Sequence, residues 1–488
     1  MVKTWANPGL DLHLDLPATR VRAGLEAALR AAVRDGRLRP GTRLPPSRAL
    51  AADLGIARNS VADAYGQLVA EGWLTTRTGS GTWVTSHPVP AHRPPAVTAR
   101  PAAPPRYDLR PGVPDLSAFP QRAWLAAARA ALASSASGVL GYPDPRGLPV
   151  LRAALADYLA RTRGVSVTPD RLVVCAGFGH GLALICALLR ARGASTLAVE
   201  SHGHQIHRRT AEAHGLRWRA LPVDGQGARA DALAAAGPDA VLLTPAHQFP
   251  LGVTLAPQRR RAIIDWAAAR GGLVIEDDYD GEFRYDRQPV GAMQALGPDQ
   301  VIYAGTASKA LAPGLRLGWL AVPAPLVDEV VAAKEAAGAE PSTVDQITLA
   351  TLLASGGYDR QIRHARLVYR RRRDRLAAAL SRSAPLVTVS GVAAGLQALL
   401  RLPPGWDEDE VAGRAAAHGL AVDGLAGYHA GGDRHPPALV IGYARPADHA
   451  FTTALARLAA ALAPEPAAPA AAARAPGRRR SAPAPPRT

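Results

Sequence analysis

The sequence predicts an α/β protein of two folded domains, in which a small winged helix-turn-helix precedes a larger α/β domain. The 488 residues exceed what one ordinary hydrophobic core requires. Two proline-rich stretches, 86–106 and 463–488, interrupt a chain that is 48% hydrophobic over its full length. These stretches cannot build a packed core, so we expect an extended linker and a disordered basic tail. The two domains are then expected over residues 10–85 and 107–462.

Apolar residues in the N-terminal domain recur at helical spacing in three places. Gly36 and Gly55 are expected to end the first two helices, and Ser47 to cap the start of the second. Two β-prone runs then flank the turn 78–81, which indicates a hairpin. Three helices and a hairpin make a winged helix-turn-helix. The apolar stripes are Val21, Leu25, Leu29 and Val33, then Leu50 and Leu54, then Val61, Tyr65 and Leu68.

Positive charge is concentrated at the two ends of the chain. Residues 1–106 carry 14 Lys and Arg against 7 Asp and Glu, and residues from 463 onward carry 5 against 1. The 356 residues between them carry 38 against 32. This distribution suits a polyanionic partner, such as DNA, for the N-terminal domain.

The cysteines indicate neither a disulfide framework nor a metal site. Cys175 and Cys186 both lie in apolar segments, so we expect two buried thiols. The sequence shows no secretory signal and no run of about 18 apolar residues. We therefore expect a cytoplasmic protein.

Short apolar runs alternate with helical patterns after the linker. Runs that are apolar on both faces and separated by helices are typical of buried, mostly parallel strands. In such sheets, ligand sites gather at the carboxyl ends of the strands. The expected strands are 172–175, 196–199, 240–244, 273–275 and 301–303.

Lysine is rare in this chain, and one lysine stands in a chemically suggestive place. Only three of the 57 basic residues are lysines, and one of them is Lys309. An amine can form a Schiff base with an aldehyde, whereas a guanidinium cannot. Ser308 and Thr306 precede this lysine and Arg316 follows it, which supplies hydroxyls and a fixed cation for a phosphate. The pattern predicts pyridoxal 5'-phosphate (PLP) as cofactor, the alternative being an ordinary surface lysine.

Two further segments follow expected strands. Asp277 is placed to pair with the protonated ring nitrogen of PLP, although an Asp-Asp pair there is also compatible with a metal site or with solvated charge. The glycine-rich segment that contains Gly179 and His180 lies between a strand and a helix, where backbone amides can meet a phosphate. Glycine loops alone are a weak indication.

The N-terminal domain resembles the GntR family of DNA-binding domains. The resemblance rests on residues 44–48, 54–61, 71–74 and 79–82, which read LPPSR, LGIARNSV, EGWL and GSGT. It implies that the start of the third helix meets base edges, where arginine and asparagine suit guanine and adenine. Phosphate or minor-groove contacts are expected from the second helix and the wing. The implied DNA-binding residues are Arg48, Arg58, Asn59, Ser60, Arg77 and Gly79.

The order of Asp277, Lys309 and Arg316 resembles that in the aspartate-aminotransferase-like PLP enzymes of fold type I. The resemblance implies that catalytic Lys309 binds the cofactor covalently, Asp277 pairs with its ring nitrogen and Tyr279 donates to its phenolic oxygen. It places Thr306, Ser308 and Arg316 at the phosphate, where the position of the glycine-rich segment also puts Gly179 and His180, and the fold implies a homodimer. With the GntR-like domain, and with motifs at 142–147, 244–250 and 277–280, the chain resembles the MocR/GabR-type transcription regulators.

Two positions depart from the aminotransferase pattern. An aromatic residue usually stacks on the cofactor ring, and its place falls on His204 in this chain. His202, His204 and His207 are an alternative candidate for a metal site, but they lack the acidic or thiolate companion that such a site needs. Val440 takes the place of the arginine that clamps a substrate carboxylate, and Arg445 stands nearby.

The sequence therefore predicts a PLP-dependent, sequence-specific transcription regulator that binds an operator in double-stranded DNA. Its effector is expected to be a small-molecule amine or PLP itself. One alternative is an active PLP-dependent aminotransferase with an accessory DNA-binding domain. Another is a PLP-free scaffold that only dimerises the DNA-binding domain.

Overall fold

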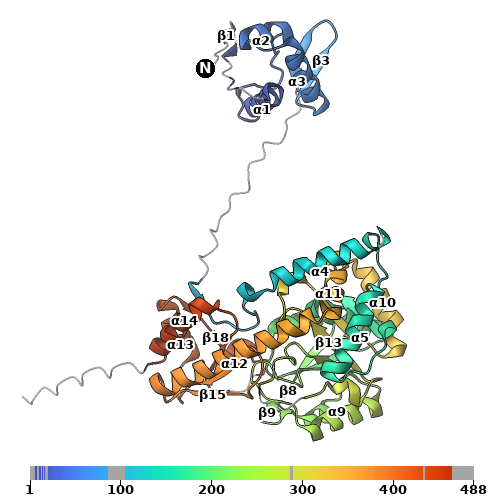
Figure 1. Ribbon diagram of the computed structural model, residues 1–488, viewed down its shortest axis with the longest axis vertical. Helices are drawn as coiled ribbons and strands as arrows, with labels where there is room; N and C mark the ends of the chain where they lie inside the picture. Colours follow the sequence, from blue (N-terminus) through green and yellow to red (C-terminus); the bar gives the residue numbers. More distant parts are fainter. Residues whose placement is uncertain are drawn as a thin grey trace, which may run out of the picture. The chain divides into compact units, whose positions relative to one another are not determined.

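The computed structural model describes residues 6–7, 10–11, 14, 16, 20–85, 105–135, 137–285, 290–431 and 435–463. The chain divides into two compact units, Met1–Ala103 and Pro104–Thr488 (Figure 1). Residues 86–104 of the expected linker and 464–488 of the expected tail lie outside the described part of the chain.

The N-terminal unit consists of three helices followed by an antiparallel hairpin, as predicted for a winged helix-turn-helix. One apolar core, to which all three helices contribute leucines, holds it together. The elements are β1 (Ala6–Asn7), β2 (Leu10–Asp11), α1 (Val21–Arg34), α2 (Ser47–Leu54), α3 (Arg58–Ala70), β3 (Leu74–Arg77) and β4 (Gly81–Val84).

The start of α2 differs from the prediction that Ser47 caps it. Ser47 is the first helical residue, Pro46 takes the cap position, and no side chain caps this end. A contact from α3 holds the preceding turn instead, because the Tyr65 hydroxyl donates to the carbonyl oxygen of Pro45 at 3.0 Å. The other end of α2 is as predicted, since Gly55 adopts the left-handed conformation that a C-terminal cap favours.

A seven-stranded sheet forms the centre of the larger unit, in the order β6-β14-β13-β12-β11-β7-β8. Along the row β13-β12-β11-β7-β8, each strand is parallel to the next. Strand β14 runs antiparallel to both of its neighbours, β13 and β6. The five predicted strands are all present. They are β6 (Leu172–Cys175), β7 (Thr196–Glu200), β11 (Ala240–Leu243), β12 (Leu273–Asp277) and β13 (Val301–Thr306).

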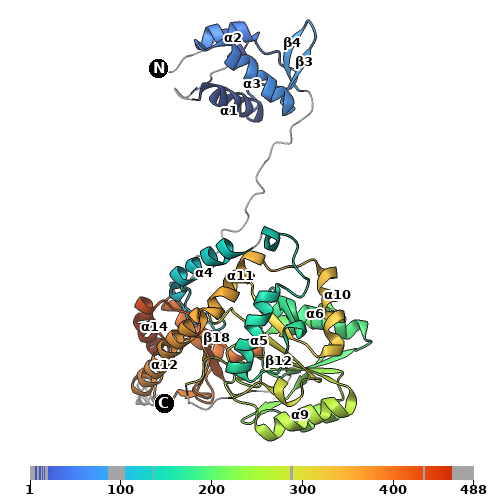
Figure 2. The same ribbon diagram turned by 45° about the vertical axis from the view of Figure 1, so that its right-hand side comes forward.

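Helices cover both faces of this sheet (Figure 2). In β11, Ala240 and Leu242 pack on the face covered by α6 (Phe178–Ala191) and α10 (Val327–Ala337). Val241 and Leu243 pack on the opposite face against α9 (Pro257–Arg270). This two-sided burial explains why the strands are continuous apolar runs rather than alternating ones. Cys175 and Cys186 are buried free thiols in this core, as predicted.

Two strands of the sheet were not predicted. In β8 (Arg217–Leu221), three of the five residues are exposed, because it lies at the edge of the sheet. An edge strand lacks the continuous apolar run that reveals a buried one. In β14 (Gly318–Ala321), all four residues are buried, but only two of them are long apolar residues.

A smaller C-terminal lobe contains a second sheet, in the order β15-β16-β19-β18. The long helix α12 (Gly357–Ser383) packs against α11 (Thr343–Ala354) of the main body and α14 (Asp448–Ala461) of this lobe (Figure 1). No helix in the described part of the chain is long and apolar enough to cross a membrane.

The remaining elements complete the larger unit. The helices are η1 (Leu116–Ala118), α4 (Gln121–Ser134), η2 (Ser137–Leu140), α5 (Pro149–Arg163), η3 (Pro169–Arg171), α7 (Gln205–Ala213), α8 (Ala230–Ala236), η4 (Met293–Leu296), η5 (Pro313–Leu315), η6 (Ala324–Leu326), α13 (Glu408–Ala417) and η7 (Leu425–Tyr428). The strands are β5 (Tyr107–Asp108), β9 (Val223–Asp224), β10 (Gly227–Ala228), β15 (Thr388–Ser390), β16 (Ala398–Arg401), β17 (Leu420–Ala421), β18 (Asp423–Gly424) and β19 (Ala438–Ile441).

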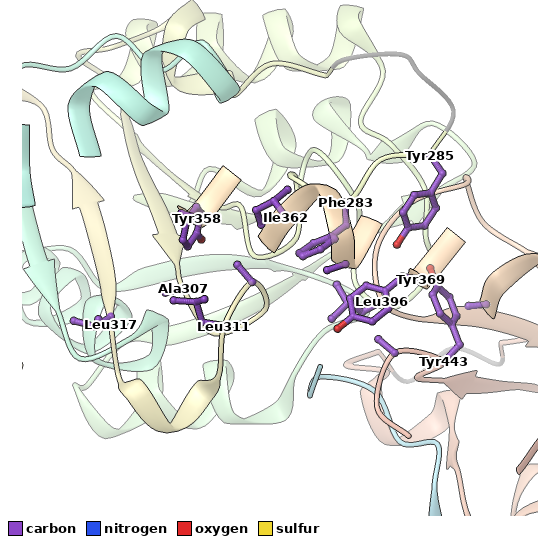
Figure 3. Close-up of a cluster of buried hydrophobic side chains, with 14 of the residues drawn as sticks. Phe283, Tyr285, Ala307, Leu311, Leu317, Tyr358, Ile362, Tyr369, Leu396 and Tyr443 are labelled. Carbon is purple, nitrogen blue, oxygen red and sulfur yellow. The ribbon is translucent and has the colours of Figure 1, made fainter. Parts of the chain in front are cut away.

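An aromatic cluster joins the main body to the C-terminal lobe (Figure 3). The rings of Phe283 and Tyr369 lie 5.6 Å apart. The hydroxyls of Tyr285 and Tyr443 both donate to the carbonyl oxygen of Gly395 at 2.6 Å. These contacts hold the chain at Gly395 in place. The next two residues, Leu396 and Gln397, line a cavity that also contains Lys309.

Helix α5 is tied to the sheet by a buried ion pair. Arg163 Nε lies 2.6 Å from Asp278 Oδ2, and Arg163 Nη2 lies 3.1 Å from Asp278 Oδ1. The two side chains are 5% and 1% exposed, respectively. Tyr303 also donates to Asp278 Oδ2, at 2.8 Å. Burial lowers the pKa of Arg163, but Asp278, Tyr303 and Glu282 together more than compensate, so that this pKa is raised.

We expect Arg163→Gln to lower the free energy of unfolding by about 3–5 kcal/mol, because it leaves the Asp278 carboxylate buried and unpaired. Urea unfolding at one protein concentration measures this loss. The control is Arg192→Gln, which breaks an exposed pair with Glu329 and should cost at most about 1 kcal/mol. Equal losses in the two variants would contradict the prediction.

Candidate functional site

A cavity lies at the carboxyl ends of the central parallel strands of the larger unit. Its volume is about 130 Å³, roughly ten times what one water molecule needs. Its walls combine apolar side chains with a larger number of polar and charged ones. The lining residues are Gly112, Phe178, Val199, Glu200, His202, Gly203, His204, His207, Arg208, Leu242, Thr244, Phe249, Asp277, Tyr279, Thr306, Ser308, Lys309, Leu396 and Gln397.

Lys309 projects into this cavity from the segment after β13. Its Nζ donates to the carbonyl oxygen of Gly112 at 2.6 Å. Burial lowers the pKa of this amine, while Asp277 and Asp280 act in the opposite direction. A lowered pKa increases the fraction of neutral amine, which is the form that attacks an aldehyde.

Asp277, the last residue of β12, shares the cavity with Lys309. The residue is 6% exposed, and its Oδ1 has no hydrogen-bond partner among the described residues. Burial raises the pKa of Asp277 well above its usual value, and Lys309 opposes that rise. A buried carboxylate oxygen without a partner is costly, so this atom is suited to a ligand that donates an N–H group.

The neighbouring acidic residues are satisfied by the protein itself. Glu276 accepts the backbone N–H groups of Met293 and Gln294, at 2.8 and 3.0 Å. Asp278 is paired with Arg163, as described above. Asp280 Oδ2 lies 2.8 Å from His247 Nδ1, and both side chains are almost completely buried. Asp277 therefore differs from the adjacent carboxylates in having an oxygen available to a ligand.

The Tyr279 hydroxyl lies in a small polar network at the cavity wall. It accepts a hydrogen bond from Gln397 Nε2 at 2.7 Å and lies 3.2 Å from His247 Nδ1. Gln397 and His247 received no role in the sequence analysis. His247 belongs to a motif that was recognised, whereas nothing in the sequence connects Gln397 with a residue 118 positions before it.

The residues expected at a phosphate are divided by the structure into two groups. Thr306 and Ser308 line the cavity, and their hydroxyls lie 2.9 Å apart. Gly179, His180 and Arg316 are not part of its lining.

Arg316 lies beside the start of α6. A Cβ atom added to Gly177 would lie 3.5 Å from Arg316 Nη1, which is ordinary contact distance and shows that the guanidinium packs beside this turn. His180 accepts the N–H of Ala176 through Nδ1 at 3.0 Å, while its buried Nε2 has no partner among the described residues. An exposed arginine near a helix N-terminus suits an anion.

His204 lies in the wall of the cavity, stacked on Phe249 with the ring centres 4.1 Å apart and an angle of 18° between the planes. Burial lowers its pKa to about 4, and that of His207 to about 3. Both rings are therefore neutral near pH 7. Within the described ranges, no group of three or more His, Cys, Asp or Glu residues is arranged to hold a metal ion.

The position expected for a carboxylate clamp is apolar. Val440, in β19, is fully buried in a small cluster with Leu399, Leu425 and Ala438. It is not among the lining residues of the cavity. Arg445 is engaged elsewhere, because its Nη2 lies 2.8 Å from Asp108 Oδ2.

The DNA-binding residues implied by the resemblance lie on the second and third helices and the wing of the N-terminal unit. Arg58 and Asn59 are exposed in the first turn of α3, and Ser60 is half-buried there. Arg48 is exposed on α2. An exposed first turn of the third helix is what a recognition helix requires.

The wing presents a second basic surface. Arg77 lies over the ring of Trp83 with its guanidinium carbon 5.3 Å from the ring centre, and Arg43 lies 5.7 Å from the same centre. Gly79, at the tip, adopts a positive φ that other residues rarely take. Arg43 was missed because only the pairing of its backbone with Trp83 brings it to the wing.

The two units match two different family models. Residues 22–84 match the gntR family of bacterial regulatory proteins, and residues 111–423 match aminotransferase class I and II. An archaeal alanine:glyoxylate aminotransferase is similar in structure, with 25% identity and a TM-score of 0.67, over 72% of this chain and 90% of that one.

Two relatives that match more than four fifths of the chain are named as transcriptional or catabolism regulators. The HTH-type pyridoxine biosynthesis transcriptional regulator PdxR of Corynebacterium glutamicum is 35% identical, over 85% of this chain and 90% of its own length. The probable rhizopine catabolism regulatory protein MocR of Rhizobium meliloti is 33% identical, over 83% and 86%. The chain belongs to this family of HTH-type transcriptional regulators, which joins a GntR DNA-binding domain to an aminotransferase-like domain.

We expect Arg58→Ala to weaken operator binding by about 1–3 kcal/mol and to relax the preference for sequence, because it removes a base-edge contact. Arg48→Ala should weaken binding to all DNA more evenly, since a phosphate contact carries no sequence information. Titrations of operator and unrelated DNA at one salt concentration separate the two effects. An Arg58→Ala protein with unchanged affinity and preference would show that α3 is not the recognition helix.

Proposed function

We propose that this regulator holds PLP in the cavity and that an amine-bearing effector, or PLP itself, changes its binding to an operator. The observation that carries the proposal is the buried, unpartnered Oδ1 of Asp277, which shares a cavity with the amine of Lys309. A ring N–H and an aldehyde on one small molecule match these two groups.

Other residues fit the remaining groups of the cofactor. The side chain of Asp277 suits the ring nitrogen and Tyr279 suits the phenolic oxygen. Thr306, Ser308 and Arg316 supply two hydroxyls and a cation for the phosphate, with Gly179 and His180 near the start of α6. His204 offers a ring face from the β7–α7 side. Bound there, PLP supplies an aldehyde that condenses with primary amines.

The protein's own groups determine what reaches that aldehyde. The lowered pKa of Lys309 keeps an amine available, and the hydrogen bond to Gly112 orients it. Val440 offers no charge to a substrate carboxylate, so the arrangement supports sensing of a ligand better than transamination of α-amino acids. Turnover with an oxo-acid acceptor would instead support the aminotransferase alternative.

Several exposed apolar side chains support a homodimer. Leu125 and Leu132 on α4 are 48% and 46% exposed, and Leu140 and Tyr142 after it are 62% and fully exposed. Val150, at the start of α5, is 55% exposed. Exposed apolar residues that follow one another along one segment of the chain are typical of a surface that another chain covers.

We expect the protein to sediment as a dimer at micromolar concentration, and a Leu140→Asp, Tyr142→Asp variant to sediment mostly as a monomer. Charges placed in an apolar interface lose hydration without gaining a partner. Leu386→Asp, at an equally exposed leucine in another part of the unit, serves as control and should remain dimeric. A wild-type monomer that binds a single half-site with full affinity would contradict the proposal.

We expect Lys309→Ala to abolish the absorbance band of the lysine-linked form of PLP and any ligand-dependent change in operator affinity, while the affinity without ligand is retained. The lysine is needed for the covalent link, whereas the DNA-binding unit is a separate compact body. Lys309→Arg, which keeps the charge but cannot condense with an aldehyde, should behave alike. The measurements are absorbance and operator titrations with and without PLP and amines. A full ligand response in either variant would show that Lys309 is not the sensor.

A further inference from the structure

Helix α12 accounts for the excess of positive charge in the larger unit. Over Gly357–Ser383 it contains nine arginines and two aspartates. Residues 107–462 carry 38 Lys and Arg against 32 Asp and Glu, and subtracting the charges of α12 leaves 29 against 30. The excess is therefore a property of this helix, and not of an arginine-rich unit in general.

The exposed side of α12 is a row of arginines on the outside of the larger unit (Figure 1). Their spacing of one to four residues places them within one side of the helix. They extend over eleven residues, or about 16 Å at 1.5 Å per residue. We call this row the basic ridge, and it consists of Arg360, Arg363, Arg366, Arg370 and Arg371.

No carboxylate of the described chain forms an ion pair with the basic ridge. Asp359 pairs with Arg161 of α5 at 2.8 Å. Asp374 is exposed and forms no ion pair within the described ranges. The buried arginine of the helix, Arg372, pairs with Asp115 and faces the interior. The charge of the ridge is therefore left to solvent or to a partner.

Three arginines of the basic ridge make no polar contact with the described protein. Arg360 and Arg366 donate to backbone carbonyl oxygens at 3.1 and 2.9 Å. Arg363, Arg370 and Arg371 form neither a hydrogen bond nor an ion pair within the described ranges. Like charges three or four residues apart destabilise a helix, so the folded unit gains nothing from this row.

The partner that fits the basic ridge is double-stranded DNA. Each DNA strand carries about one negative charge per 3.4 Å, so about five phosphates match the 16 Å of the ridge. DNA is also the ligand that the gntR family of the N-terminal unit implies. Because both units belong to one chain, a duplex held by the first is at a high local concentration for the second. A second copy that met the ridge with its own would be repelled.

We propose that the basic ridge of α12 binds the phosphate backbone of the DNA that flanks the operator. Phosphate contacts carry no sequence information, so they add affinity without changing which operator is read. The aminotransferase-like unit then contacts the same duplex as the DNA-binding unit, through a surface that is separate from the cavity around Lys309.

The experiment measures how much the flanks of an operator contribute to binding. The operator is selected by the full-length wild type from a random-sequence pool and is placed in duplexes with short or long flanks. Flanks of about 5 and about 25 base pairs are used, because the longer one extends about 85 Å at 3.4 Å per pair. Binding is followed by fluorescence anisotropy over a series of salt concentrations.

Two variants that lose equal charge are compared. Glutamine has a helix propensity similar to that of arginine, so α12 should remain folded, and circular dichroism verifies this. The test variant is Arg363→Gln, Arg370→Gln, Arg371→Gln. The control changes three exposed arginines on α7 and β8 and is Arg209→Gln, Arg217→Gln, Arg219→Gln.

We expect the long flanks to tighten binding of the wild type roughly tenfold or more at low salt. Each phosphate contact adds about 0.9 to the slope of log K against log salt. On the long duplex, the test variant should therefore lose up to about 2.7 of this slope for each copy of α12 that contacts DNA. It should bind both duplexes as the wild type binds the short one, and the control should keep the gain from the flanks.

Three results would overturn the inference. The first is a wild type that binds the two duplexes equally. If that protein binds poly-L-glutamate and the test variant does not, the ridge belongs to an acidic protein instead. The second is a test variant that keeps the gain from the flanks. The third is a control that loses the gain to the same extent, because net charge rather than α12 then determines it.

Discussion

The segment that follows β12 concentrates acidic side chains in the interior, and the site depends on how each is neutralised. Glu276 is held by two backbone N–H groups, Asp278 by Arg163 and Asp280 by His247. Each of these carboxylates is neutralised by a different neighbour, so η4, α5 and the loop after β11 must all meet at this strand end. Asp277 alone among these carboxylates keeps an oxygen without a partner, and it faces the cavity. The protein therefore positions one carboxylate for a ligand by satisfying the others.

Motifs that are short in sequence could be predicted, and contacts between distant segments could not. The strand positions and the grouping of Asp277, Tyr279 and Lys309 follow from apolar runs that end at one edge of a sheet, where the structure also places them. Gln397 and Arg208 carry no such pattern. Arg208 is one of 54 arginines, that is, 57 basic residues less three lysines, and only its burial distinguishes it. The Ser47 cap was wrong because Ser47 is itself the first helical residue and Pro46 takes the cap position.

The two compact units limit how a ligand can act on DNA. A ligand can change operator affinity only to the extent that it binds two arrangements of a regulator differently. The residues implied to bind DNA are all on the N-terminal unit, whereas the cavity is built entirely from the larger one. On the proposed function, coupling would therefore pass through the arrangement of the larger units in the proposed dimer or through the connecting segment, and not through a residue shared by the two sites.

An apolar residue at Val440, where the resemblance implies a carboxylate clamp, has different consequences for catalysis and for binding. A transaminating enzyme needs its substrate held so that a proton can be removed and returned at one carbon, which requires orientation as well as affinity. A sensor needs only affinity that differs between two states. Val440 lies in an apolar cluster outside the lining of the cavity, so β19 brings no charge to a ligand there. On the proposed function, the cavity can therefore serve binding next to Lys309 without the orientation that turnover requires.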